Sequence, residues 1–219
     1  MTPLALSARM ATDAGAVRRE AAHDAKRTRV LAGMVSATAA KGYASVTVAD
    51  VVAAAKVSRS TFYEQFPSLS ECYLAAYDAC LHDLSSLLLT PRRGLRRTIG
   101  DYLRALVAAP AAARTCMVEV YAVGPEAVRR RLAHQQVFVD AYEAMHRELA
   151  RRGEPVRPLT RFDFEAIVTT ISATVTNEVA IGNTAGLEAL TDPLVGFIRG
   201  CFGLDVYSGT PDLNEETDR

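Results

Sequence analysis

The chain has 219 residues, of which 49% are hydrophobic and 23% charged. This composition is typical of a folded globular protein and argues against a disordered or membrane-embedded chain. The 25 basic and 25 acidic residues cancel, but residues 1–60 hold nine basic and four acidic side chains, which leaves the remainder acidic. Length and charge together indicate a chain in two parts, with a basic N-terminal part.

The two ends of the chain have biased compositions. Residues 1–25 lack a sustained amphipathic face and are interpreted as a mobile arm, and the acidic segment 210–219 as a frayed tail. The N-terminus has no apolar core of the kind found in signal peptides, and no segment approaches 18 uninterrupted apolar residues. The four cysteines form no CxxC pair. We therefore expect a cytoplasmic protein that makes no membrane contact.

Helical periodicity begins over residues 25–41. Thr47 then predicts a helix start, because its hydroxyl can cap the amide of Asp50 while that carboxylate reaches back. After a break, Ser58 is a second N-cap candidate and opens a short helix that ends at Gln65, before Phe66-Pro67. Two short capped helices separated by a tight turn are typical of a helix-turn-helix.

All later segments have helical periodicity, with breaks at proline and glycine. The segment 167–179 contains enough β-branched residues for a strand, but its length and the lack of a partner strand favour a buried helix. The sequence predicts an all-α fold with further helices near residues 68–89, 94–108, 111–122, 125–152, 160–183 and 187–202.

The sequence contains none of the common catalytic signatures, such as GxSxG, GxxxxGK[ST], GxGxxG or HExxH. Histidines and carboxylates occur together on predicted helices, but without the spacing of a metal site. These groups are His82 with Asp78, and His134 and His146 with Glu143. We expect a protein that is not an enzyme and has no cofactor or metal.

The segment Gly42 to Tyr77 contains the pattern Thr-Val-x-Asp-Val-x-x-x-Ala-x-Val-Ser-x-x-Thr-Phe-Tyr-x-x-Phe. This order resembles the N-terminal domain of the TetR family of transcriptional regulators, and the resemblance covers about residues 26–78. It implies a helix-turn-helix DNA-binding domain over residues 26–67 and a helical ligand-binding and dimerisation domain over residues 68–209. Two positions depart from the family pattern: Lys56 stands where a turn glycine is usual, and Leu69 where a lysine is common.

The short helix after Ser58 is rich in hydrogen-bonding side chains that can reach phosphates or base edges. The resemblance implies that Arg59 and Ser60 face base edges. It implies contacts to the DNA backbone for Thr47, Ser58, Thr61, Tyr63 and Gln65, and Lys56 is expected to add a phosphate contact. For the serines and threonines, helix capping is the alternative role.

The C-terminal part offers two candidate surfaces. The first is a ligand pocket, or alternatively plain core, formed by Met117, Tyr121, Phe138, Tyr142 and Met145. The second is a dimer interface, because the last two predicted helices carry more apolar residues than one core face requires and typically form a four-helix interface in proteins that resemble this one. The predicted interface residues are Ile171, Val175, Leu194, Phe197, Ile198 and Cys201; burial of both helices within one chain is the alternative.

The sequence thus predicts a homodimeric, sequence-specific DNA-binding regulator, in which a small apolar or amphipathic effector releases a repressor from its operator. The expected partners are double-stranded DNA, a second copy of the chain and the effector. Two alternatives stay open. One is a DNA-binding or DNA-organising factor that needs no inducer, and the other is an all-α enzyme or adaptor with a decayed helix-turn-helix.

Overall fold

The computed structural model describes residues 23–88 and 94–204. Most of the expected N-terminal arm and all of the expected acidic tail lie outside these ranges. The described residues form helices and no strand, which confirms the predicted all-α fold.

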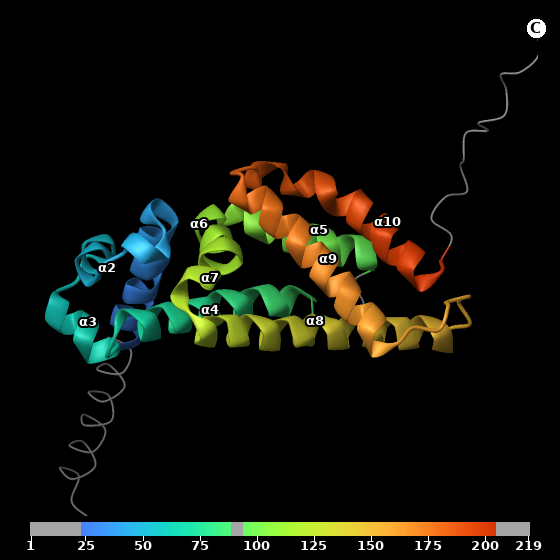
Figure 1. The fold of residues 1–219 in the computed structure, drawn as a ribbon, viewed down its shortest axis with the longest axis horizontal. Helices are drawn as coiled ribbons and strands as arrows, with labels where there is room; N and C mark the ends of the chain where they lie inside the picture. The colour runs from blue at the N-terminus through green and yellow to red at the C-terminus, as the bar shows by residue number, and fades with distance from the viewer. Residues whose placement is uncertain (1–22, 89–93, 205–219) are drawn as a thin grey trace, which may run out of the picture.

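The N-terminal part is a cluster of one longer helix and short ones (Figure 1). A first helix over residues 23–41 is followed by the single 3-10 turn η1 (Tyr43–Ser45) and then by α2 (Val48–Ala55) and α3 (Arg59–Gln65). Helix α4 (Leu69–Leu88) leads from this cluster into the rest of the molecule (Figure 1). The predicted pair of short capped helices is confirmed.

The C-terminal part packs longer helices around one another (Figure 1). Helix α8 lies against α4 on one side and α9 on the other, while α5 packs against η3 and α10. The elements after α4 are α5 (Leu95–Ala108), α6 (Pro110–Arg114), the π-helical segment η2 (Thr115–Glu119), α7 (Val120–Val123), α8 (Pro125–Arg151), α9 (Arg161–Ala180), η3 (Thr184–Leu190) and α10 (Thr191–Phe202).

Two predicted helices differ from the structure. The helix predicted over residues 111–122 is interrupted by the π-helical η2. The helix predicted over residues 187–202 begins instead as the 3-10 segment η3, and the α-helix starts at Thr191. Pro193 stands in the first turn of α10, where its missing amide hydrogen costs no helical hydrogen bond, so the α-helix begins just before it.

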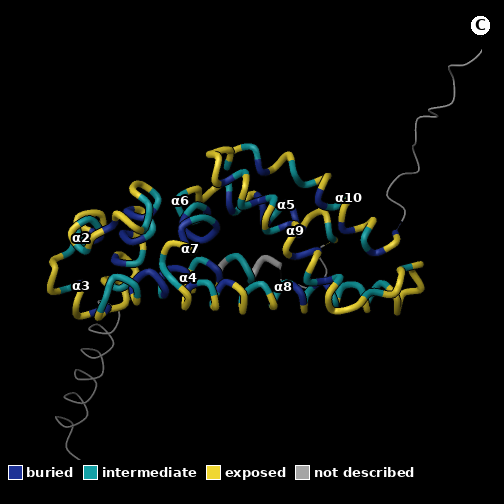
Figure 2. Tube along the Cα trace, viewed as in Figure 1, coloured by how far each residue is buried: buried dark blue, intermediate teal, exposed yellow. Residues whose placement is uncertain are grey.

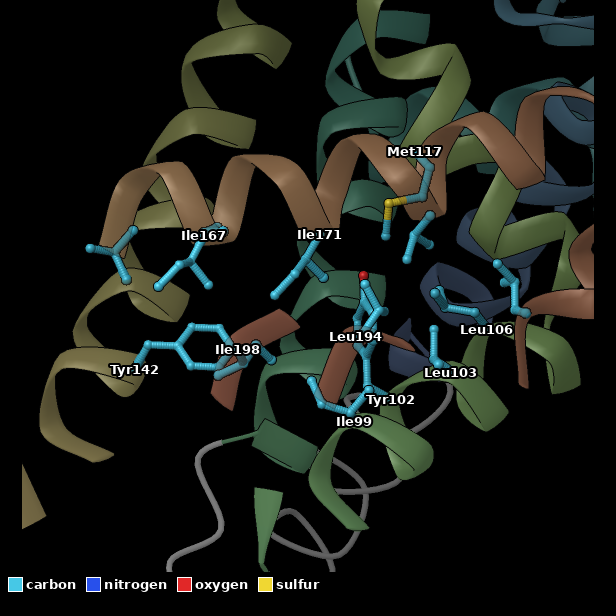
Figure 3. Packing of buried hydrophobic residues seen from close by; sticks show 14 of the residues in the cluster. Ile99, Tyr102, Leu103, Leu106, Met117, Tyr142, Ile167, Ile171, Leu194 and Ile198 are labelled. Atoms are coloured by element: carbon cyan, nitrogen blue, oxygen red, sulfur yellow. The ribbon is translucent and has the colours of Figure 1, made fainter. Parts of the chain in front are cut away.

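The buried residues, dark blue in Figure 2, form two hydrophobic clusters. The first lies beneath the N-terminal helices and is anchored by Met34, Val51 and Phe62. It continues into α4 and is completed by Cys116, Val120 and Ala127. The second cluster fills the space among α5, α8, α9 and α10, where side chains such as Tyr102, Met117 and Ile171 converge (Figure 3).

Membrane-spanning potential is weak in the described part of the chain. No single helix there is both long and apolar enough to cross a bilayer. Only α5 combined with the segment Pro110–Val123 meets the requirement by length and composition, and these two are bent by 101° relative to each other.

Candidate DNA-binding surface and internal cavity

Helix α2 begins with the predicted capping box. The Thr47 hydroxyl accepts a hydrogen bond from the amide of Asp50 at 3.3 Å, and the Asp50 carboxylate accepts one from the Thr47 amide at 3.0 Å. Lys41 forms an ion pair with the same carboxylate. The hydrogen bonds from Lys41 and Thr47 lower the pKa of Asp50 to about 2. Thr47 therefore orders the start of the helix-turn-helix.

Lys56 ends α2 in a left-handed conformation, with φ 54° and ψ 48°. Among the described residues it is the one non-glycine residue with a positive φ. Its amide donates to the carbonyl of Ala53 at 3.3 Å, which closes the turn. The turn therefore keeps a glycine-like geometry although a lysine occupies it, and the side chain is exposed.

Helix α3 is anchored on one side and open on the other. Ser58 accepts from the amide of Thr61 at 3.1 Å, and the Phe62 side chain is fully buried. The opposite side exposes Arg59 and Ser60, together with Tyr63, which is 51% exposed. The helix presents a hydrogen-bonding face held in place by an aromatic anchor.

Gln65 does not lie on this face, so its predicted DNA contact is wrong. Its side chain is only 9% exposed, and neither amide atom has a hydrogen-bond partner. The cause is its helical position, because Gln65 follows the buried Phe62 by three residues and shares the inward side with Phe66. Glu64 is exposed in its place, and sequence reasoning did not single it out.

Arg27 links the first helix to the end of α3. Its guanidinium lies 4.4 Å from the centre of the Phe66 ring and donates to the backbone carbonyl of Gln65 at 3.3 Å. Lys26 and Arg29 on the same helix are exposed. Arg27 therefore helps to fix the orientation of α3.

An internal cavity of about 50 Å³ lies among α4, α5, α8 and α9. Met117, Phe138 and Tyr142 line it, as three of the five predicted ligand-pocket residues. The other two do not line it: Tyr121 is 56% exposed, and Met145 packs at the edge of the second hydrophobic cluster.

The polar side chains of the cavity centre on Arg131, which is only 8% exposed. Its Nε donates to the Tyr121 hydroxyl at 2.9 Å, and its Nη2 donates to the Ser172 hydroxyl at 2.7 Å. His134 also lines the cavity, and its buried Nε2 has no partner. Burial lowers the pKa of His134. Sequence reasoning missed Arg131, because nothing in the pattern distinguishes it from its less buried neighbours Arg129 and Arg130.

The π-helical segment η2 contacts the N-terminal helices directly. The Thr115 hydroxyl donates to the Val35 carbonyl at 3.3 Å, and the Tyr73 hydroxyl donates to the Thr115 carbonyl at 2.6 Å. The buried Glu119 accepts from the Tyr43 amide at 3.0 Å. Met117, in the same segment, lines the cavity. One five-residue segment therefore touches both the helix-turn-helix part and the cavity.

Most of the predicted dimer-interface residues are buried within a single chain, so their assignment is wrong. Ile171, Val175, Leu194 and Ile198 belong to the second hydrophobic cluster and have almost no accessible surface. The reason is that α9 is central and packs against α6, α8, α10, η2 and η3. Cys201 is half-buried, and Phe197 is 37% exposed.

The histidines do not assemble a metal site. Within residues 23–88 and 94–204, no group of three His, Cys, Asp or Glu side chains is placed to hold a metal ion. His82 is exposed, and the His146 Nε2 lies 2.9 Å from the carbonyl oxygen of Arg157.

Comparisons with known proteins agree with this architecture. The sequence model described as bacterial regulatory proteins, tetR family, matches residues 31–76. No curated protein matches the chain. The fatty acid degradation regulator FadR from Bacillus halodurans has a similar fold, with a TM-score of 0.68 at 16% identity over 79% of this chain and 94% of that chain.

Two further solved structures share the fold. FadR from Bacillus subtilis, in complex with stearoyl-CoA, gives a TM-score of 0.66 at 17% identity, over 78% of this chain and 96% of that one. NalD, the secondary repressor of the MexAB-OprM multidrug efflux pump in Pseudomonas aeruginosa, gives 0.61 at 16% identity, over 80% and 94%. The matched segment 31–76 and the arrangement of the remaining helices therefore resemble those of the TetR family of bacterial regulatory proteins.

Proposed function

We propose that this protein is a transcriptional repressor that binds an operator as a homodimer and leaves it when a small ligand occupies the internal cavity. The observation that carries the proposal is the outward face of α3. There Arg59, Ser60 and Tyr63 are exposed beside the buried Phe62. An arginine can bind guanine through two hydrogen bonds in the major groove, and a tyrosine hydroxyl can donate to a phosphate.

The proposed ligand response uses α4 and η2. Helix α4 leads from α3 into the C-terminal helices, and its residue Tyr77 lines the cavity. Segment η2 adds a second connection through Thr115 and Glu119. A ligand that binds one arrangement of these elements better than the other shifts the separation of the two α3 helices in a dimer. Reciprocity then requires operator DNA to weaken ligand binding by the same factor.

The proposed dimer surface is the outer side of α9 together with α10. Small exposed side chains recur along α9 at Ala166, Ala173 and Ala180, so a partner helix can approach closely. Phe162 and Ile181, at the two ends of this side, are 75% and 74% exposed. Exposed apolar residues on a helix side of this kind are typical of a protein interface, and most oligomers of identical chains are symmetric.

The relatives support this proposal by their described roles. FadR of Bacillus subtilis is seen with an acyl-CoA, and NalD is a repressor. One regulator of this fold therefore binds a ligand, and another is a repressor.

The test is to select genomic DNA fragments on the purified protein and sequence those retained. We expect enrichment of one motif with two inverted half-sites about one helical turn apart or somewhat further. Retention of fragments without a shared motif would contradict sequence-specific binding. Titration of the enriched site in the presence of cavity ligands then separates the repressor from a factor that needs no inducer.

A further inference from the structure

We propose that the cavity binds amphipathic monocarboxylates, with the carboxylate on Arg131 and the apolar body among the surrounding aromatic and aliphatic side chains. This inference rests on the proposed function only in treating the cavity as the effector site. It concerns the chemical class of the ligand, which direct binding measures without DNA.

Arg131 lacks a counter-charge in the described parts of the chain. The side chain is 8% exposed, yet within the described parts of the chain no carboxylate forms an ion pair with it. Its hydrogen-bond partners are the neutral hydroxyls of Tyr121, Ser172 and Tyr77. A buried charge is costly unless it is paired, so a cation surrounded by neutral acceptors favours an anion from outside the chain.

Further polar side chains line the cavity near Arg131. The buried Nε2 of His134 has no hydrogen-bond partner. Gln135 donates to the Ser172 hydroxyl at 3.2 Å and also lines the cavity. These groups stand beside the guanidinium at one wall, where a carboxylate with several lone pairs can accept from more than one of them.

The remaining walls of the cavity determine which kind of ligand body fits beside the head group. They are apolar or aromatic and offer no second cation, so one head group and one apolar body fit them. They comprise Leu81, Leu84, Ile99, Tyr102, Met117, Phe138, Tyr142, Val168 and Ile171. The cavity of about 50 Å³ admits a head group and the first carbons, and a longer body requires adaptable side chains such as Met117 to move.

The experiment compares charged and neutral ligands of the same length by isothermal titration calorimetry. Hexanoate and octanoate are titrated into the full chain at pH 7.5, beside hexanamide and octanamide. We expect each carboxylate to bind at least about tenfold more tightly than its amide, because hydrogen bonds to a charged group are about twice as strong. Equal affinities, or no binding of either carboxylate, would overturn the proposal.

A substitution then assigns the preference to Arg131. Arg131→Met should lower octanoate affinity at least about tenfold and leave octanamide affinity within about threefold, so the head-group preference disappears. The matched control is Arg147→Met, which removes an exposed arginine from the same helix and should preserve the preference. A preference that survives in Arg131→Met overturns the assignment.

The proposal stays testable if Arg131→Met does not fold, because the comparison of octanoate with octanamide uses the unmodified chain. In that case Arg131→Lys replaces the variant, and we expect a weaker but persistent preference, since lysine keeps the charge without the two-pronged geometry. A complete insensitivity of octanoate affinity to this change would also contradict the arginine contact. Operator release is measured separately, so a carboxylate that binds without releasing DNA refutes the repressor mechanism alone.

Discussion

Lys56 combines a strained backbone with a charge beside α3, and one pair of substitutions separates the two. A left-handed conformation costs a non-glycine residue about 1–2 kcal/mol. A glycine avoids this cost, but it also makes the unfolded chain more flexible, which offsets part of the gain in stability. We expect Lys56→Gly to raise the free energy of unfolding by about 0.5–1 kcal/mol in urea titrations. The same variant should bind operator more weakly if the ammonium group contacts a phosphate.

The matched control is Lys56→Asn, because asparagine tolerates the left-handed conformation without carrying a charge. It should lose the same DNA affinity as Lys56→Gly while changing stability less. Unchanged operator affinity in both variants would remove Lys56 from the proposed contacts.

Arg59 and Tyr63 should differ in how their loss affects DNA recognition. Arg59→Ala should cost about 1–3 kcal/mol per half-site and flatten the preference at one or two base pairs. Tyr63→Phe removes one hydroxyl and should weaken binding to all sequences similarly. Fluorescence anisotropy with a set of single-base operator variants distinguishes the two patterns. An unchanged sequence preference in Arg59→Ala would assign base recognition to other residues.

His134 should make stability depend on pH below neutrality. Burial lowers its pKa below the ordinary 6.5, so the unfolded chain takes up a proton at a pH where the folded chain resists it. Its contribution is therefore complete above about pH 6.5 and declines as the pH falls. Urea unfolding at pH 7.5 and 5.5 should show a smaller loss of stability in His134→Gln than in the unmodified chain; equal losses would contradict this.

Individual residues differ in how far the sequence predicts them. The burial of Gln65 was predictable, because Gln65 follows Phe62 by three residues and therefore lies on the same side of the helix. The burial of Arg131 was not, since it stands in a run of three arginines and only the packing of α8 against α7 and α9 decides which of them turns inward.

Among the elements, η2 offers a test of communication between the cavity and the DNA-binding helices. Glu119→Gln keeps the side-chain shape but removes the ion pair with Arg114, 3.1 Å away, and weakens the bond from the Tyr43 amide. We expect a loss of about 1–2 kcal/mol in unfolding free energy and a smaller effect of cavity ligands on operator affinity.

The control for this prediction is Glu126→Gln, which breaks exposed ion pairs with Arg129 and Arg130 on α8. Such pairs contribute little, so stability and ligand response should change by less than about 1 kcal/mol. A ligand response that is unaffected by Glu119→Gln would place the communication in α4 alone.

Element boundaries were largely predictable because their signals are local. The capping box at Thr47, the serine cap of α3 and the proline and glycine breaks all act within a few residues. The π-helical turn of η2 was not predictable. Its extra residue is accommodated by long-range bonds, from Tyr73 to Thr115 and from Tyr43 to Glu119, which no local pattern reveals.

For the whole molecule, the proposed dimer depends on contacts made by the outer side of α9. A glutamate at Ala173 would place a charge in the middle of that side, so Ala173→Glu should convert the dimer to a monomer in sedimentation velocity at micromolar concentration. Ala133→Glu, on the exposed side of α8, is the matched control and should stay dimeric. A monomeric unmodified chain would refute the dimer itself.

The sequence predicted the all-α architecture but not which side of α9 is free. Apolar residues surround most of that helix, and this pattern was interpreted as surplus surface for a partner. In the structure α9 packs against five neighbouring elements of its own chain. Val175 and Val179 are therefore buried in the core of a single chain. Tertiary packing of this kind has no signature in the periodicity of one helix.

The first hydrophobic cluster also has a consequence for synthesis on the ribosome. It combines residues 30–81 with Cys116, Val120 and Ala127, so the DNA-binding part cannot complete its core until a distant segment has emerged. At about 5–20 residues per second, the interval between residues 81 and 127 lasts roughly 2–9 s. During that time Tyr73 and Tyr77 lack part of their cover. The nascent helix-turn-helix therefore depends on the C-terminal part before any operator or ligand is present.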